Sequence, residues 1–247
     1  FTIHQPVGIV VAITPFNYPA LLVLHKLAPA LAAGNAVVLK PARTTPLTAL
    51  ALARCLTDAG LPDGVLSVLT GPGRIIGDAL VTDPRVRKVS FTGSTATGEH
   101  IARIAGIKKL SLELGSSCPV VVLPDADIEL AASAVAAGGY INAGQVCISV
   151  QRVITHPAVA ADFLDALVPK VEAIRTGDPG SPDTTMGTLI TTDEAERVEE
   201  TIRRAVDEGA KLLTGGGRDG AIVAPAVVAG VDPRSSFSQE ELFGPAV

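Results

Sequence analysis

The sequence predicts an α/β protein of two lobes, each built as a Rossmann-like, doubly wound parallel sheet. Short runs rich in valine and isoleucine alternate with longer segments of helical periodicity along most of the chain. Several of these runs are apolar at consecutive positions, as in Val7–Ile13, which is typical of parallel strands buried on both faces. Hydrophobic residues make up 47% of the 247 residues and charged residues 18%, which provides enough apolar surface for a sizeable core.

The first predicted lobe covers residues 1–114 and alternates strands with helices. Its strands are expected at Val7–Ile13, Ala36–Leu39, Val65–Leu69, Val86–Phe91 and Leu110–Leu114. Its helices are expected at Leu21–Ala33, Pro46–Ala59, Ile75–Val81 and Thr97–Ile104. The second of these helices has clear boundary signals, because Thr45 is a suitable N-cap and Gly60 follows its end. Alternation at this spacing favours parallel strands joined by helical crossovers.

The second predicted lobe covers residues 115–247. Its strands are expected at Pro119–Leu123, Arg152–Thr155, Lys211–Thr214 and Ala221–Val228. Its helices are expected at Ile128–Ala137, Val159–Ile174 and Thr192–Glu208. The chain begins at Phe1 within a strand-like pattern and ends at Val247 without a natural stop. We therefore expect a central fragment of a longer protein, truncated at both ends.

Composition argues against several classes of function. The net charge is −5, and without a basic cluster the chain is not expected to bind nucleic acid. The longest apolar stretch, residues 20–39, is interrupted by His25, Lys26, Pro29 and Asn35, so no membrane span is predicted. No signal peptide is visible, and a cytoplasmic location is expected. The cysteines and histidines are scattered, which predicts neither a disulfide framework nor a metal site.

Cys147 is the first residue that could carry chemistry. It lies in a segment of small residues, 142–149, between a predicted helix and a predicted strand, where a thiol can stay accessible. A thiolate there could act as a nucleophile, whereas the alternative is a buried core cysteine, which is common. Cys55, inside a predicted helix, fits that alternative better, and Cys118 is ambiguous.

Other candidates follow predicted strands of the first lobe, at the ends where open α/β sheets place their ligands. Glu113 is either a general base or a partly exposed strand-end glutamate. Lys40 is either a cation for a ribose or phosphate or a lysine that reaches solvent. Asn17 is either an oxyanion donor or a turn residue. The turn at residues 92–94, before a predicted helix, is either an anion site or an ordinary capped turn.

Taken together and in this order, the motifs closely resemble those of the aldehyde dehydrogenase superfamily. The matching stretches span nearly the whole chain: Thr14-Pro-Phe-Asn-Tyr-Pro19, Leu39-Lys-Pro41, Phe91-Thr-Gly-Ser94 with Gly98, Leu112-Glu-Leu-Gly115, Gly144-Gln-Val-Cys147 and Glu241-Leu-Phe-Gly-Pro245. The separation of Glu113 and Cys147 along the chain also matches. This combination outweighs the alternative that Cys147 is only a core residue.

The resemblance implies NAD(P)-dependent oxidation of a small aldehyde to the carboxylic acid. It implies that Cys147 is the nucleophile, that Glu113 assists hydrolysis of the thioester, and that Asn17 stabilises the oxyanion with the Cys147 backbone N–H. The residues that it implies for cofactor binding are Lys40, Arg43, Gly71, Gly93, Ser94, Glu241 and Phe243. It implies no metal, and a homo-oligomeric parent protein.

Two departures from the family pattern bear on specificity. Arg43 stands where many NAD-using members have a glutamate that binds the adenosine ribose, so NADP is the favoured cofactor. The run Gly144–Arg152 resembles the lactaldehyde and non-phosphorylating glyceraldehyde-3-phosphate branch. Members that use a phosphorylated aldehyde tend to have a basic residue before the cysteine, where Val146 stands here. A small unphosphorylated aldehyde is therefore expected.

Three alternative functions stay open at this stage. The chain could be a non-catalytic or inactive fragment of such an enzyme. It could belong to an acylating, coenzyme A-dependent relative on the same fold, although acylating members often lack the glutamate found at Glu113. It could also be a nucleotide-binding α/β protein in which Cys147 is only structural.

Overall fold

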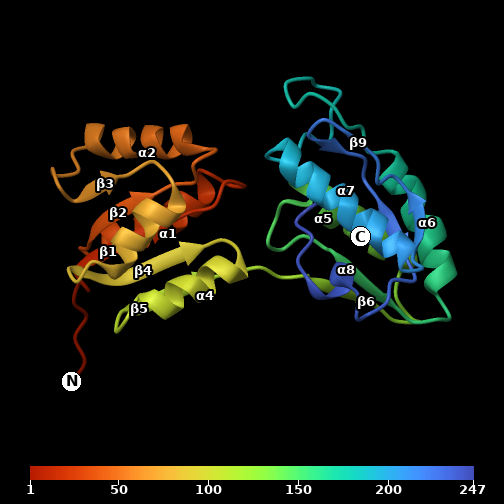
Figure 1. Cartoon of the computed structure of the whole chain (residues 1–247), viewed down its shortest axis with the longest axis horizontal. Coiled ribbons are helices and arrows are strands. Elements are labelled where there is room, and N and C mark those ends of the chain that lie inside the picture. The colour runs from red at the N-terminus through yellow and green to blue at the C-terminus, as the bar shows by residue number, and fades with distance from the viewer. The chain divides into compact units, whose positions relative to one another are not determined.

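The structure, a computed structural model, describes residues 1–247. The chain divides into two compact units, Phe1–Gly115 and Ser116–Val247. Each unit has its own hydrophobic core, and each is described separately. Figure 1 shows the first unit in red to yellow and the second in green to blue.

The first unit is organised around a five-stranded parallel sheet with the order β3-β2-β1-β4-β5. Its strands are β1 (Ile9–Ile13), β2 (Ala36–Lys40), β3 (Leu66–Val68), β4 (Val86–Thr92) and β5 (Lys109–Glu113). Ile13 lies opposite Lys40 on one side and Phe91 on the other, and Thr92 lies opposite Glu113. The carboxyl ends of β1, β2, β4 and β5 therefore meet at one edge of the sheet.

Helices cover both faces of this sheet (Figure 1). They are α1 (Leu21–Ala32), α2 (Pro46–Asp58), a π-helical turn η1 (Gly73–Gly77), α3 (Asp78–Thr82) and α4 (Thr95–Ile104). Alternate residues of β1 enter two different cores. Val10 and Ala12 share a core with buried residues of α1 and α2, whereas Val11 and Ile13 share one with α3 and α4. This division explains why β1 is apolar at every position.

The second unit combines one parallel strand pair with two antiparallel pairs. The strands are β6 (Pro119–Val122), β7 (Arg152–Thr155), β8 (Lys211–Thr214), β9 (Arg218–Asp219), β10 (Ile222–Val223) and β11 (Val227–Ala229). β6 pairs in parallel with β7, while β8 pairs with β11 and β9 with β10 in antiparallel fashion. The helices are α5 (Ile128–Tyr140), a 3-10 turn η2 (Ile141–Gly144), α6 (Ala160–Glu172), α7 (Thr192–Asp207) and α8 (Ser236–Gln239).

One face of the β6–β7 pair is packed and the other is exposed. Val122 shares a core with Phe163 and Leu167 of α6 and with buried residues of α5. On the opposite face the cross-strand partners Val121 and Ile154 are 60% and 50% exposed.

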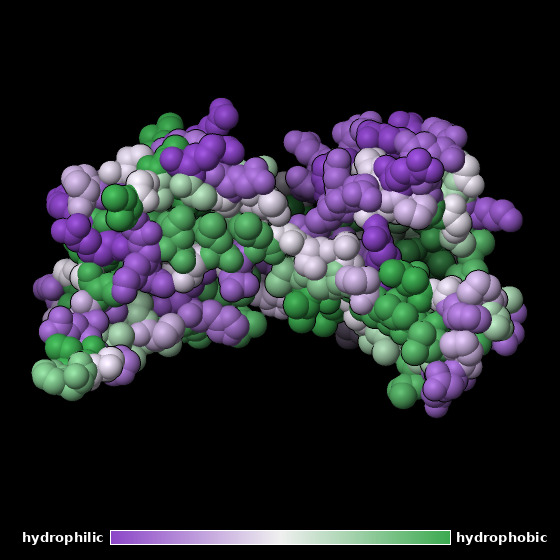
Figure 2. Space-filling view, turned by 90° about the horizontal axis from the view of Figure 1, so that it is seen from below, coloured by the Kyte–Doolittle hydropathy of each residue, from purple (hydrophilic) through white to green (hydrophobic).

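Figure 2 shows apolar residues at the surface of both units. None of the helices is both long enough and apolar enough to span a bilayer.

The expected α/β fold with a parallel sheet is confirmed, with several local differences. The helix expected at Ile75–Val81 begins as the π-helical turn η1 and continues as α3. The strand expected at Ala221–Val228 is interrupted, because Pro225 has no N–H to donate to a ladder. The short elements β9 and α8 were not expected, and the β8–β11 pair is antiparallel. Thr45 occupies the N-cap of α2, but its hydroxyl donates to the Phe16 carbonyl oxygen at 3.4 Å.

Candidate active site

The carboxyl edge of the first sheet gathers three of the predicted site residues. Lys40 is the last residue of β2 and Glu113 the last residue of β5, while Asn17 lies in the loop between β1 and α1. The backbone holds this edge together, since the Thr14 N–H donates to the Lys40 carbonyl oxygen at 3.2 Å. Lys40 is only 6% exposed, and burial lowers the pKa of its ammonium group. The Glu113 side chain is exposed on this unit.

Lys26 is a functional candidate that the sequence reasoning missed. Although it is only 8% exposed, its Nζ donates to Thr92 Oγ1 at 2.8 Å and to Ser90 Oγ at 3.2 Å. Burial lowers the pKa of Lys26 to about 8, while the Glu113 carboxylate opposes this shift. The buried positions of α1 are Val23, Lys26 and Leu27, an i, i+3, i+4 pattern. That helical spacing is the signal that could have found Lys26.

The turn after β4 is fixed to the neighbouring strand and to the helix that follows it. The Gly93 N–H donates to the carbonyl oxygen of Glu113 at 3.0 Å, which ties the turn to β5. A side chain at Gly93 would overlap the ring of Phe91. Ser94 Oγ accepts the Thr97 N–H at 3.4 Å and caps α4. The remaining first-turn N–H groups of this helix are a suitable anion site.

A pocket of about 420 Å³ lies within the first unit, beside this turn. Lys40 from β2, Arg74 from η1 and Arg103 from α4 line it, so that its charge is mainly positive. The one acidic residue in its lining, Asp78, contacts His100 Nε2 at 2.9 Å. Three cations around a small cavity suit a phosphate-bearing ligand such as a nucleotide.

Two other predicted cofactor residues of this unit lie outside the pocket lining. Arg43 is exposed, three residues beyond β2, and does not line the pocket. Gly71 precedes η1 with φ +145°, a backbone region that only glycine adopts readily. A side chain there would also meet Ile76. Arg74, which was not predicted, lines the pocket, and the cofactor roles of Arg43 and Gly71 stay predictions.

Cys147 lies in the second unit, at the start of a tight turn. The Ser149 N–H donates to the Val146 carbonyl oxygen at 2.9 Å and closes this turn. The thiol is partly exposed, and the Cys147 N–H has no acceptor in the chain. Val146 before it is 4% exposed, so its side chain belongs to the core. An accessible thiol beside a free N–H is the arrangement that addition to a carbonyl group needs.

Polar side chains on both sides hold the Cys147 turn in place. The Gln145 amide is buried: its Oε1 accepts the Ile190 N–H at 2.8 Å, and its Nε2 donates to the Asn142 carbonyl oxygen at 3.0 Å. On the other side, Ser149 Oγ lies 3.1 Å from the Gly139 carbonyl oxygen. The motif Gly144-Gln-Val-Cys147 therefore includes an anchor, Gln145, beside the predicted nucleophile.

Position 144, just before this turn, requires glycine because the loop that contains Gly244 lies against it. Gly144 has φ +70°, and a Cβ there would overlap the carbonyl oxygen of Gly244. The residues that follow Glu241 thereby approach the segment that precedes Cys147. The structure thus brings two of the sequence motifs together inside the second unit.

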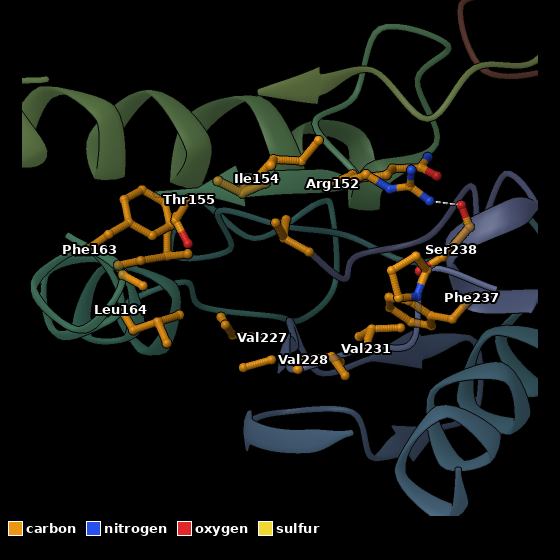
Figure 3. A pocket seen from close by; sticks show the side chains of 18 residues that line it. Arg152, Ile154, Thr155, Phe163, Leu164, Val227, Val228, Val231, Phe237 and Ser238 are labelled. Atoms are coloured by element: carbon orange, nitrogen blue, oxygen red, sulfur yellow. Dashed lines mark hydrogen bonds between the residues drawn. The ribbon is translucent and has the colours of Figure 1, made fainter. Parts of the chain in front are cut away.

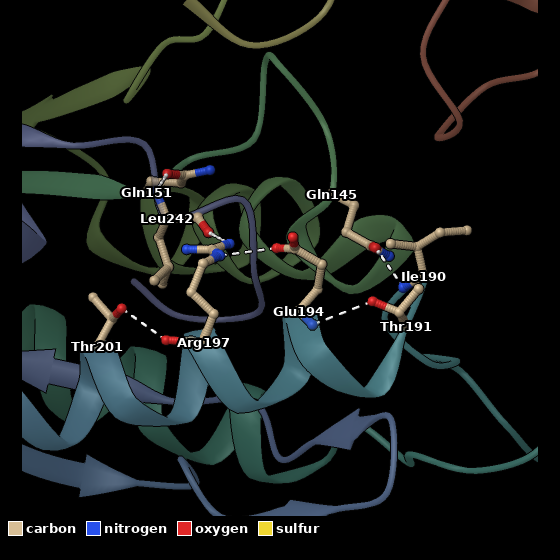
Figure 4. A network of polar contacts seen from close by, with 8 residues as sticks. All are labelled: Gln145, Gln151, Ile190, Thr191, Glu194, Arg197, Thr201 and Leu242. Carbon is tan, nitrogen blue, oxygen red and sulfur yellow. Dashed lines mark hydrogen bonds and ion pairs between the residues drawn. The ribbon is translucent and has the colours of Figure 1, made fainter. Parts of the chain in front are cut away.

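The loop that contains Glu241 is fixed by a polar network, drawn in Figure 4. The Leu242 N–H donates to Gln151 Oε1 at 2.9 Å, and Arg197 Nη2 donates to the Leu242 carbonyl oxygen at 2.6 Å. Glu194 in turn accepts from Arg197 Nε at 2.8 Å. These hydrogen bonds fix both the N–H and the carbonyl group of Leu242, the residue that follows Glu241.

The Glu241 carboxylate itself is half-buried. It accepts the Ser116 N–H at 3.3 Å. Burial raises the pKa of Glu241, although the Ser116 N–H and the Arg197 cation act in the opposite direction. Phe243 two residues later has a left-handed backbone with φ +50°. Glu241 and Phe243 therefore lie on one fixed loop, near the segment of Cys147.

The second unit also contains an apolar pocket of about 500 Å³, shown in Figure 3. Side chains such as Phe163, Leu164, Val231 and Phe237 line it, and none of the predicted site residues does. The guanidinium of Arg152 in its wall donates to the carbonyl oxygen of Ser238. It offers no nucleophile and no acid–base pair, so we assign it no catalytic role. No cluster of His, Cys, Asp and Glu that could hold a metal ion occurs in the chain.

The predicted site residues thus form two sets. Asn17, Lys40, Arg43, Gly71, Gly93, Ser94 and Glu113 belong to the first unit, while Cys147, Glu241 and Phe243 belong to the second. Within the first unit, Asn17, Lys40, Gly93, Ser94 and Glu113 follow strand ends at one sheet edge. Within the second, the Cys147 and Glu241 segments meet through Gly144 and Gly244.

Known proteins with similar sequences are aldehyde dehydrogenases. A 3-sulfolactaldehyde dehydrogenase from Priestia megaterium is 50% identical over 247 residues, which cover 100% of this chain and 52% of that protein. A lactaldehyde dehydrogenase from Methanocaldococcus jannaschii is 43% identical over 251 residues, covering 100% of this chain and 54% of that one. The chain spans about half the length of the curated relatives it matches.

Solved structures give the same family. Glyceraldehyde-3-phosphate dehydrogenase GapN from M. jannaschii, complexed with NADP, superposes with a TM-score of 0.95 at 43% identity, over 98% of this chain and 54% of that one. Betaine aldehyde dehydrogenase from Staphylococcus aureus, in complex with NAD+, also gives 0.95, at 37% identity over 98% and 50%. The aldehyde dehydrogenase family matches residues 1–247 throughout. The chain belongs to the aldehyde dehydrogenase family.

Proposed function

We propose that the protein oxidises a small aldehyde to its carboxylic acid with NAD(P) as the hydride acceptor and Cys147 as the nucleophile. The observation that carries this proposal is the Cys147 turn. Its thiol is accessible, its own N–H is free, and Gln145 and Ser149 fix it from both sides. A nucleophile needs this combination of access and fixed geometry.

Residues in both units fit a nicotinamide cofactor. The pocket beside α4, with Lys40, Arg74 and Arg103 in its wall, would hold the adenosine part. The turn with Gly93 and Ser94 would hold the phosphates at the capped end of α4. Glu241 would bind the nicotinamide ribose, with Phe243 on the same loop. When bound, the nicotinamide ring supplies the chemistry of accepting a hydride.

The addition step uses residues of the chain alone. The Cys147 thiolate attacks the carbonyl carbon, and the aldehyde oxygen becomes an oxyanion. The Asn17 side-chain amide and the Cys147 N–H donate hydrogen bonds to this oxyanion. One such donor is worth about 3 kcal/mol of barrier lowering. Loss of a hydride from the resulting carbon leaves a thioester on Cys147.

Glu113 then removes a proton from the water that attacks the thioester carbonyl, and Cys147 leaves as its thiolate. The exposed carboxylate at the end of β5 is accessible for this step. An acylating relative would pass the acyl group to coenzyme A instead. Product analysis separates the two, because hydrolysis yields the free acid with no coenzyme A added. We expect the free acid, from lactaldehyde or similar short aldehydes; a strict requirement for coenzyme A would reject the hydrolytic mechanism.

NADP is the favoured cofactor because one arginine lines the pocket proposed for the adenosine and a second follows a lysine of its lining along the chain. Arg74 lines the pocket and has no partner in the chain, and Arg43 follows the buried Lys40 by three residues. Replacing Arg43 by glutamate places an anion there, which should repel a 2′-phosphate and favour NAD. We expect Arg43→Glu to raise kcat/KM for NAD and to weaken binding of 2′,5′-ADP relative to 5′-AMP. Unchanged values of both would remove Arg43 from cofactor selection.

The substrate proposed is a small unphosphorylated aldehyde of the hydroxyaldehyde type. Two relatives are named for lactaldehyde and 3-sulfolactaldehyde. The position before the nucleophile carries no cation, since Val146 is packed in the core. If instead this chain is an inactive fragment, a nucleotide will still stabilise the first unit against heat, but no aldehyde will be oxidised.

A further inference from the structure

Cys118 lies against the proposed nucleophile. Its sulfur is 3.1 Å from the carbonyl oxygen of Cys147 and 3.3 Å from Ser116 Oγ. Both cysteines are free and partly exposed. The chain has only three cysteines, and Cys55 is on α2 of the other unit. Two thiols that are distant in the sequence are thus neighbours inside the second unit, on the loop before β6 and the turn before β7.

The loop that carries Cys118 has an unusual backbone. Cys118 has φ +35°, the left-handed region, and its N–H donates to Ser116 Oγ at 3.2 Å. Few residues other than glycine, asparagine or aspartate adopt this region. The conformation turns the Cys118 side chain toward the Cys147 turn. A cysteine at this position therefore places a second thiol beside the Cys147 turn.

We propose that Cys118 is a resolving thiol, which forms a reversible disulfide with Cys147 when the protein meets a hydroperoxide. The proposal rests on the proposed function, because it requires Cys147 to be the reactive thiol. A disulfide needs its two Cα atoms within about 7 Å. The Cys118 sulfur already contacts the backbone of Cys147 through its carbonyl oxygen, so the Cys147 side chain has to reach a sulfur that lies beside its own backbone.

The chemistry balances with hydrogen peroxide as the oxidant. The Cys147 thiolate attacks one peroxide oxygen, the O–O bond breaks, and the sulfur, oxidised by two electrons, becomes a sulfenic acid. The Cys118 sulfur then attacks the sulfenic sulfur, the S–O bond breaks, and the hydroxyl group leaves as water with the Cys118 proton. In sum, two thiols and one peroxide give one disulfide and two waters. A dithiol reductant reverses the step by exchange.

The consequence is protection of the nucleophile. A sulfenic acid without a neighbouring thiol is oxidised further to sulfinic and sulfonic acids, which thiols do not restore. With Cys118 in place, oxidation of Cys147 stops at a state that a reductant reverses.

The test is an oxidation experiment on the reduced 247-residue chain, and it needs no enzymatic turnover. The chain is treated with hydrogen peroxide, alkylated and analysed by intact mass and peptide mapping. We expect loss of two of the three alkylatable thiols, a mass lower by two hydrogens and a Cys118–Cys147 cross-linked peptide. Dithiothreitol should restore both thiols. Cys55→Ser is the matched control and should form the same cross-link.

Cys118→Ser, which keeps the size and polarity of the side chain, should instead accumulate oxygen atoms on Cys147. Identical oxygen addition in the wild type and Cys118→Ser, with no cross-linked peptide, would overturn the proposal. Labelling of the reduced chain by iodoacetamide separates the resolving role of Cys118 from the proposed nucleophilic role of Cys147. Cys147 labelled faster than Cys55 without any cross-link would reject only the resolving role. Cys147 labelled no faster than Cys55 would reject both that role and the proposed nucleophile.

Discussion

Lys26 is the residue whose burial has the clearest measurable consequence. Its ammonium group is enclosed by the sheet edge and is hydrogen-bonded to two hydroxyls, Ser90 and Thr92. Neither hydroxyl carries a charge, so desolvation is not fully offset and the pKa falls to about 8. The Glu113 carboxylate is the nearby group that favours the charged form. Lys26, whose pKa burial lowers to about 8, is therefore coupled electrostatically to the proposed base.

This lowered pKa predicts how the stability of the chain depends on pH. Between pH 8 and the usual lysine value of 10.5, the folded chain has lost the Lys26 proton while the unfolded chain retains it. Unfolding then takes up a proton, so the free energy of unfolding rises with pH across this window. We expect the urea midpoint of the wild type to rise relative to that of Lys26→Met from about pH 7 to 9.5.

Lys109→Met is the matched control for this measurement, since Lys109 is an exposed lysine of the same unit. Its stability difference from the wild type should not change over the same pH range. Parallel pH curves for the wild type and Lys26→Met would contradict the lowered pKa of Lys26.

At the scale of elements, the regular helices and strands were predictable from the sequence, and the irregular segments between them were not. Strand β1 and helix α7 follow from runs and periodicities a few residues long, which local sequence determines. The π-helical start at η1 has no such local signal, whereas the break at Pro225 follows from a residue that the sequence shows and that was not taken into account. Gln145 was within a recognised motif, yet its anchoring role needs Ile190, which is remote in the sequence. Lys26 was identified in the sequence only as an interruption of an apolar stretch, although its helical spacing with Val23 and Leu27 places it on the buried face of α1.

Gly144 shows how two distant elements meet, and it makes a prediction at this scale. Gly144→Ala combines a strained left-handed backbone with overlap on the Gly244 carbonyl group. We expect it to lower the free energy of unfolding by more than about 2 kcal/mol, measured by urea denaturation. Labelling of Cys147 by iodoacetamide should change as well, because the turn is displaced.

Gly220→Ala is the control that introduces the backbone strain without the steric overlap found at Gly144. Gly220 also has a left-handed backbone, with φ +58°, but a Cβ there meets nothing within 4 Å. Gly220→Ala should lower the free energy of unfolding by about 1 kcal/mol. Equal losses of stability in the two variants would mean that the contact between Gly144 and Gly244 is not a constraint.

At the scale of the whole molecule, the family followed from motifs, whereas the assembly of the site did not. Residues 1–247 belong to the aldehyde dehydrogenase family and span about half the length of related proteins. The roles of the two lobes, cofactor binding and nucleophilic catalysis, stay predictions. The proposed mechanism would require Asn17 and Glu113 of the first unit to act on the same carbonyl group as Cys147 of the second. Residue spacing cannot give such a geometry, because it depends on how folded units meet.

The most direct test of the central claim is aldehyde-dependent reduction of NADP and NAD, followed by the absorbance of the reduced nicotinamide. The wild type is compared with Cys147→Ala and with Cys55→Ala, which removes the thiol of the first unit. If Cys147 is the nucleophile, reduction is abolished in Cys147→Ala and unchanged in Cys55→Ala. Equal rates of reduction in the wild type and Cys147→Ala would contradict the account.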